Sequence, residues 1–346
     1  MLLQDLLNIE LPIIQAPMAG AQNHALTVAV SNAGGLGSLP AALLSAEALT
    51  DEIGAITKLT SKPFNLNFFC HAEPGDNSEK IKAWKQSLDH YYQDLGVEDI
   101  DSPPGGIRMP FDERAVEVVE KTKPPVVSFH FGLPKHSLLA RVKSSGAKIM
   151  STATTVEEGL WLQERGVDLV IAQGLEAGGH RGHFLSMELG LQMDTVSLVQ
   201  QLLSKIDIPV VAAGGISDAK SVARIMSLGA AGVQVGTAYL LCPEAKISAI
   251  HRSALKNKEI RETALTNLFS GRPARGIINQ LMKDIGPLNP EVPDFPLAGS
   301  ALSPLKKAAE KIDRDDFSSL WCGSQYQNCQ EKSAADITRL LCQDIT

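Results

Sequence analysis

The sequence predicts an α/β protein of the (β/α)8 TIM-barrel class with a small helical cap domain. Three observations predict this class: short apolar runs alternate with longer helical patterns, the runs number eight, and they fall within about 235 residues, close to the usual size of a barrel. A doubly wound open sheet is the main structural alternative. The number of runs and the length together favour the barrel.

The predicted strands are short and rich in β-branched or apolar residues. Most are followed by a helical segment, and several of these segments end in glycine or begin with Asp, Ser or Thr, which can cap a first turn. The strands are expected at residues 12–16, 36–41, 64–69, 126–131, 147–153, 168–173, 209–214 and 232–236.

Two regions interrupt the alternation. Residues 71–111 form a long, polar segment that contains several prolines and glycines. We expect this segment to be an insertion over one mouth of the barrel. From residue 243 to 320 the strand signal disappears, and ISAIHRSALKNK, TALTNLF, ARGIINQLMKDI and SPLKKAAEKI are interpreted as helices. The predicted division is therefore a barrel over 1–242, a helical cap over 243–320, and a C-terminal segment, 321–346, that packs back on the barrel.

The composition restricts the class of protein and its partners. Hydrophobic residues make up 44% of the 346 residues and the net charge is −7, which argues against nucleic acid or an anionic membrane as the main partner. The five cysteines are scattered without a C-x-x-C pair, so neither a disulfide framework nor a metal site is indicated. No stretch has the length of a transmembrane helix, so we expect a cytoplasmic protein. We expect it to be a monomer or a homodimer.

Two glycine-bearing loops follow the seventh and eighth predicted strands. PVVAAGGISDA contains Gly215, and GVQVGTAYL contains Gly236 and Thr237. Bare backbone N–H groups at such loops can hold a phosphate, and barrels most often bind phosphate after these two strands. For either loop alone, glycines that merely serve a tight turn are the better explanation. The presence of both loops at these two positions favours phosphate binding.

The stretch AQGLEAGGHRGHF, residues 172–184, follows the sixth predicted strand. Gln173 can form a hydrogen bond with a polar ring edge, and Gly178 and Gly179 leave room for a flat ligand near the backbone. His180 then projects from a flexible loop at the carboxyl end of a strand, a position that favours proton transfer over a structural role. Arg181 is a candidate for binding an anionic substrate, and a surface salt bridge is an equally good explanation. Nothing in the spacing singles out His183.

Other polar or soft side chains lie near predicted strand ends. His130, in SFHFG, can line a pocket or be a satisfied core histidine. Asn67 is a polar residue in an apolar strand and needs a partner if buried. Met18 offers a soft wall to an aromatic ring, with ordinary packing as the alternative. Cys70 has no neighbour in sequence that would activate its thiol, so no nucleophile is nominated.

Several motifs together resemble one enzyme family. IIQAPMAG, FNLNFF, SFHFGLP, QGLEAGGHRG, PVVAAGGI, VQVGTAYL and FSGRPARGIIN, in this order, are similar to the nitronate monooxygenases, formerly called 2-nitropropane dioxygenases. EAGGHRG and SFHFGLP are typical of the first class of this family. The resemblance implies an FMN-dependent (β/α)8 barrel that oxidises alkyl nitronates, such as propionate 3-nitronate, with molecular oxygen. It also implies a flavin semiquinone, a carbonyl product with nitrite, and a detoxifying use.

The resemblance also implies roles for single residues. His180 corresponds to the catalytic histidine, acting as a base towards neutral nitroalkanes or as an electrostatic partner of a bound nitronate. His130 and Arg181, which the resemblance does not assign, are the candidates for substrate contacts from their positions in the sequence alone. The residues that would bind FMN, with Met18 as a wall, are Asn67, Gln173, Gly178, Gly215, Gln234, Val235, Gly236 and Thr237.

The alternative function is an NAD(P)H-dependent flavin reductase, acting on a quinone or an enoyl thioester, on the same barrel. The FMN-binding loops do not separate the two functions, whereas EAGGHRG and SFHFGLP favour nitronate oxidation. The chain departs from the family pattern at AGAQN, residues 19–23, and at LWCGSQYQN, residues 320–328.

Overall fold

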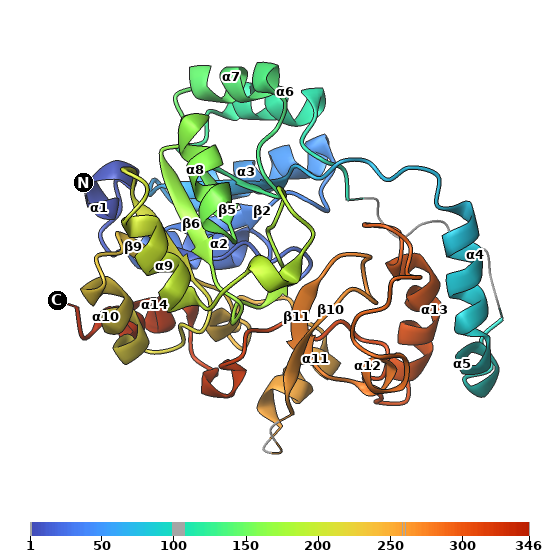
Figure 1. Ribbon diagram of the computed structural model, residues 1–346. Helices are drawn as coiled ribbons and strands as arrows, with labels where there is room; N and C mark the ends of the chain where they lie inside the picture. Colours follow the sequence, from blue (N-terminus) through green and yellow to red (C-terminus); the bar gives the residue numbers. More distant parts are fainter. Residues whose placement is uncertain (1, 99–107, 258, 260, 346) are drawn as a thin grey trace.

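The computed structural model describes residues 2–98, 108–257, 259 and 261–345. Eight parallel strands follow one another around a barrel in chain order, and a bridge between Ile14 and Leu36 joins the first strand to the second (Figure 1). These strands are β1 (Ile13–Gln15), β2 (Gly37–Pro40), β3 (Phe64–Phe69), β4 (Val126–His130), β5 (Lys148–Ala153), β6 (Leu169–Gln173), β8 (Val210–Ala213) and β9 (Gly232–Val235). All eight predicted strands are confirmed, and so is the barrel.

The helices predicted between the strands surround the barrel. Several begin at the polar residue expected to cap them; the side chains of Asp112, Thr155 and Asp194 each accept a hydrogen bond from a first-turn backbone N–H. The helices are α2 (His24–Asn32), α3 (Ala46–Leu59), α6 (Glu113–Thr122), α7 (His136–Ser144), α8 (Val156–Glu164), α9 (Thr195–Leu203), α10 (Ala219–Ser227) and α14 (Ala334–Cys342).

The inside of the barrel is apolar at one end and polar at the other. At the end where the strands begin, the short helix α1 (Leu3–Leu7) buries Leu3 and Leu7 against Ile14, Met150 and other inward-facing residues. Where the strands end, the buried inward side chains are amides and hydroxyls, among them Asn67 and Gln173. Hydrophobic burial therefore closes the first end and leaves the second for a polar site.

Residues 243–320 are not purely helical, so part of the predicted cap is wrong. TALTNLF and the start of ARGIINQLMKDI were expected to be helices, but they contain the antiparallel strands β10 (Thr263–Thr266) and β11 (Ala274–Ile277). β11 also pairs with β7 (Gly179–His180), from the loop that follows β6. The remaining segments are helices as predicted: α11 (Ala249–Lys256), α12 (Gln280–Ile285) and α13 (Gly299–Glu310).

The insertion packs on this second unit through α4 (Ser78–Ser87) and α5 (Asp89–Asp94). α4 lies beside α13, at the side of the molecule away from both termini (Figure 1). Trp84 is fully buried there and its indole N–H donates to the carbonyl of Ala298 at 3.2 Å. The expected cover over the barrel mouth is therefore limited, within the described residues, to the segment that returns from residue 108. No helix in the described part of the chain is long and apolar enough to cross a membrane.

Candidate active site

A cavity of about 540 Å³ opens where the barrel strands end. Its wall is built from residues of β3, β4 and β5 near their carboxyl ends and from the loops after β1, β2, β6, β8 and β9. Arg108, α11, α13 and the segment around residues 318–325 complete it. Eleven of the twelve predicted site residues line it, and they are Met18, Asn67, His130, Gln173, Gly178, His180, Gly215, Gln234, Val235, Gly236 and Thr237.

His180 is held in the wall by the second unit. Its short strand β7 pairs with β11, so that His180 lies opposite Ala274. The imidazole Nε2 lies 2.8 Å from the Ser270 hydroxyl, and that hydroxyl is 3.2 Å from the carbonyl of Arg272. If Ser270 donates to this carbonyl, Nε2 carries the proton and donates to Ser270. We assign this tautomer from the network, and it leaves Nδ1 as the free basic nitrogen.

The backbone of His180 is fixed from the barrel side. Its carbonyl oxygen accepts from the Gln173 amide at 2.9 Å and lies 3.2 Å from Nε2 of His130. Gln173 also accepts from the N–H of Gly182 at 2.7 Å, and Thr152 lies 3.1 Å from the other ring nitrogen of His130. Gln173 and His130 therefore both line the cavity and orient the loop that carries His180.

The surroundings keep His180 unprotonated. Burial lowers its pKa well below the ordinary value, and the positive charge of Arg108 adds to the effect, followed by His130 and Arg272. Burial likewise lowers the pKa of His130 to about 3. A neutral imidazole and nearby guanidinium groups make this region favourable for an anion.

Aromatic rings surround His180 on the same side of the cavity. The ring of Phe295 lies 5.3 Å from the imidazole, Trp321 lies 5.7 Å away, and Phe131 and Phe69 lie at 6.2 and 6.3 Å. These rings exclude water, which strengthens electrostatic interactions at the imidazole.

Backbone donors gather at another part of the wall. The N–H groups of Gly215, Gly236 and Thr237 face no hydrogen-bond acceptor within the described residues. Gly215 has a φ of +67°, a conformation that glycine adopts without strain. Thr237 also begins the short 3-10 turn η2 (Thr237–Tyr239). Bare donors of this kind are suited to a phosphate group.

Two amide side chains border the space between these donors and His180. The side-chain oxygen of Gln234 is buried without a partner among the described residues, and Asn67 donates to Ser128 at 3.0 Å. The sulfur of Met18 lies close by, 3.6 Å from where a Cβ on Gly236 would be. A flat heteroaromatic ring with polar edges would satisfy the orphaned oxygen and pack against the thioether.

Gly178 is needed for a different reason from the one predicted. A Cβ there would come within 2.4 Å of the Cys322 backbone, so the missing side chain lets the C-terminal segment approach the loop. Of the two glycines predicted to leave room for a flat ligand, Gly179 does so, because a Cβ there would meet nothing within 4 Å.

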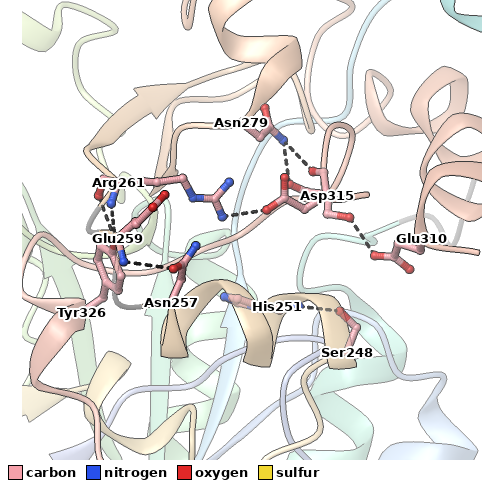
Figure 2. A network of polar contacts seen from close by, with 10 residues as sticks. Ser248, His251, Asn257, Glu259, Arg261, Asn279, Glu310, Asp315 and Tyr326 are labelled. Carbon is pink, nitrogen blue, oxygen red and sulfur yellow. Dashed lines mark hydrogen bonds and ion pairs between the residues drawn. The ribbon is translucent and has the colours of Figure 1, made fainter. Parts of the chain in front are cut away.

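The C-terminal segment is fixed by a polar network in the second unit (Figure 2). Arg261 pairs with Asp315 at 2.7 Å, and its backbone N–H and carbonyl both bond the hydroxyl of Tyr326. Asn279 donates to the carbonyls of Asp315 and Ser318. These contacts hold both ends of residues 315–326, the segment that brings Trp321 to the cavity.

Arg181 does not reach the cavity, so its prediction as a substrate contact is corrected. Its side chain is fully buried and donates to the carbonyls of Gly174 and Gln173, each at 2.7 Å, and to the side chain of Gln192 at 2.8 Å. The guanidinium satisfies the backbone of the loop after β6, which is a structural role.

Sequence reasoning missed several residues of the wall. Arg108 and Trp321 line the cavity, and Ser270 and Phe295 contact His180; all four lie outside the barrel loops, in the insertion and the second unit. The available signals were FSGRPARGIIN, which contains Ser270, and LWCGSQYQN, which contains Trp321; both were used only in the comparison with the family pattern.

Together, the barrel, the bare backbone donors and the buried imidazole at one cavity are typical of a class, the (β/α)8-barrel enzymes with their site at the carboxyl ends of the strands. The family model for nitronate monooxygenase matches residues 1–344. A nitronate monooxygenase of Pseudomonas aeruginosa is 38% identical over 98% of this chain and 97% of its own. The chain therefore belongs to the nitronate monooxygenase family, whose members are oxidoreductases.

Solved structures agree with this assignment. A nitroalkane oxidase from Streptomyces ansochromogenes superimposes with a TM-score of 0.89 at 35% identity, over 99% of this chain and 97% of that one. FabK from Thermotoga maritima is more distant, with a TM-score of 0.73 at 26% identity over 99% and 94% of the two chains.

The buried position of Arg181 leads to a prediction about stability. Arg181→Met removes the donors to two buried carbonyls, and we expect the free energy of unfolding to fall by about 2–4 kcal/mol. Urea denaturation measures this change. Arg165→Met, at an exposed arginine stacked on Trp161, is the control and should cost less than about 1 kcal/mol. Unchanged stability with a raised KM for substrate would instead restore Arg181 as a substrate contact.

Proposed function

We propose that the protein binds FMN and uses molecular oxygen to oxidise small alkyl nitronates of the propionate 3-nitronate type to a carbonyl compound and nitrite. The observation that carries the proposal is the setting of His180: a neutral imidazole, surrounded by aromatic rings and guanidinium charges, beside a cradle of bare backbone donors. Family membership supports the same reaction.

The cavity fits FMN. Gly215, Gly236 and Thr237 would hold the phosphate through their N–H groups, and the buried oxygen of Gln234 would find a donor on the ring system. Asn67 and Met18 would border that ring. FMN, when bound, would supply the redox chemistry, accepting electrons from the substrate and passing them to oxygen.

The protein's own groups favour an anionic substrate over a neutral one. A nitronate is already deprotonated, so it needs positive potential and orientation, which Arg108 and the fixed His180 loop supply. A neutral nitroalkane must lose a proton, and Nδ1 of His180 is the available base. Because the pKa of His180 is depressed, its protonated form is unfavourable and the imidazole is a weak base. Neutral nitroalkanes are therefore expected to be poor substrates.

His180→Asn tests this division of roles. We expect activity on neutral 1-nitropropane to fall about 10²-fold or more, since a general base is lost, while activity on propionate 3-nitronate falls less than about 10-fold. Oxygen uptake measures both rates. His136→Asn, at an exposed histidine outside the cavity wall, is the matched control. Equal losses on the two substrates would contradict the role of Nδ1 as a base.

Gly215→Ala tests the cradle for FMN. A Cβ at φ +67° strains the loop and would lie 3.2 Å from Cβ of Glu176, so the N–H should shift away from the phosphate. We expect the ratio of flavin to purified protein, read by absorbance, to drop several-fold. Gly146→Ala is the control: it has a φ of +88° but open space and no place in the cavity wall. Full flavin content in both variants would reject the cradle.

Anaerobic mixing separates nitronate oxidation from the NAD(P)H-dependent reductase alternative. We expect propionate 3-nitronate to change the flavin absorbance and NADH or NADPH to leave it unchanged. Bleaching by a reduced nicotinamide without any response to the nitronate would establish the reductase instead.

A further inference from the structure

Arg108 lies where the insertion returns to the barrel, and it lines the cavity. Two contacts lie along the backbone there. The imidazole of His71 lies next to the main chain of Arg108, and the N–H of Phe111 donates to the carbonyl of Phe69 at 2.7 Å. His71 is itself buried, with its ring 4.8 Å from Phe295. The guanidinium therefore projects from a fixed base.

The guanidinium and the imidazole of His180 border the same aromatic ring. Cζ of Arg108 lies 5.8 Å from the centre of Phe295, and the ring of His180 lies 5.3 Å from it. Of the charges that act on His180, Arg108 has the largest effect on its pKa. A small ligand at the imidazole is thus within the field of this cation.

Arg108 has no counter-ion within the described residues. No hydrogen bond or ion pair joins its guanidinium to another described side chain, although it is mostly buried. Among the described residues that line the cavity, Glu176 is the one carboxylate, and it accepts from the N–H and hydroxyl of Thr195 at 2.9 and 2.8 Å. A buried cation without a partner is unfavourable, and a carboxylate matches the planar fork of a guanidinium.

The other cations of the cavity wall are less suited to such a partner. Lys246 is exposed to solvent, and Lys306 lies 3.8 Å from Glu310 on its own helix. Neither combines burial with the lack of a counter-ion, as Arg108 does.

We propose that Arg108 determines specificity by binding a carboxylate on the far end of the nitronate substrate, so that short carboxylated nitronates are preferred to plain alkyl nitronates. In this arrangement the nitronate group lies at His180 and the carboxylate at Arg108, both of which line the cavity. This inference rests on the proposed function for the identity of the reacting group. The placement of the carboxylate rests on the burial of Arg108 at the cavity wall and on its lack of a counter-ion within the described residues.

The first test compares two substrates of the holoenzyme. Propionate 3-nitronate carries the carboxylate, and propyl-1-nitronate has a methyl group in its place. In Arg108→Gln we expect the ratio of their kcat/KM values to fall about 10- to 100-fold, mostly through a higher KM for the carboxylated substrate. Arg108→Lys keeps the charge without the fork and should recover part of the ratio. Arg165→Gln, outside the cavity, should leave the ratio unchanged.

The second test measures binding without turnover. Succinate has the skeleton of propionate 3-nitronate with a carboxylate in place of the nitronate group, so it carries a negative charge at each end. Butyrate has the same length but a carboxylate at one end only. Titration of the oxidised holoenzyme, followed by the flavin difference spectrum, should give tighter binding of succinate than of butyrate. Arg108→Gln should remove most of this difference.

The outcomes separate this inference from the proposed function. Failure of the wild-type protein to oxidise either nitronate rejects the proposed function, yet a succinate preference that depends on Arg108 still supports the carboxylate subsite. An unchanged substrate ratio in Arg108→Gln, or equal binding of succinate and butyrate by the wild-type protein, overturns the subsite. If Arg108→Gln does not fold, the comparison of succinate with butyrate in the wild-type protein still tests the carboxylate subsite.

Discussion

One carbonyl oxygen, that of His180, connects the barrel with the second unit. It accepts from Gln173 at the end of β6 and lies within reach of His130 at the end of β4, while the residue itself pairs with β11. A backbone group held from both sides has little freedom to move. The direction of the imidazole, and with it the shape of the cavity, depends on this double attachment.

The electrostatics of the site follow from the same arrangement. Because β11 and its preceding loop lie against the loop after β6, Arg272 comes close to the buried histidines, and its guanidinium stacks on Phe131 at 4.1 Å. Aromatic rings exclude water from one side and cations face the imidazole from another. Burial and like charge then act in the same direction on its pKa, so the region that holds His180 is built for a negative partner more than for strong base catalysis.

The barrel and most of its polar wall were predictable because they depend on local patterns. Apolar runs such as FNLNFF form strands wherever helices can cover them, and loops at strand ends must meet at one face. The hairpin of β10 and β11 was missed because its strands are short and carry Arg275 among small residues. Such strands are stabilised by their partners, including β7 from a distant loop, and not by their own pattern. Arg181 was misplaced for a related reason: its carbonyl partners exist only after the loop folds back on itself.

The two departures from the family pattern show how the wall tolerates different residues. In AGAQN, the side chain of Gln22 accepts from the N–H of Met18 at 2.9 Å and donates to the carbonyl of Ser38, so it fixes the turn that carries the methionine. In LWCGSQ, the N–H of Gly323 donates to the hydroxyl of Thr237 at 2.9 Å. Both segments thus orient wall residues through hydrogen bonds within the protein, one through the side chain of Gln22 and the other through the backbone of Gly323. The side chains of Gln22 and Thr237 satisfy nearby backbone N–H groups, so the turn after β1 and the C-terminal segment are both fixed at the cavity wall.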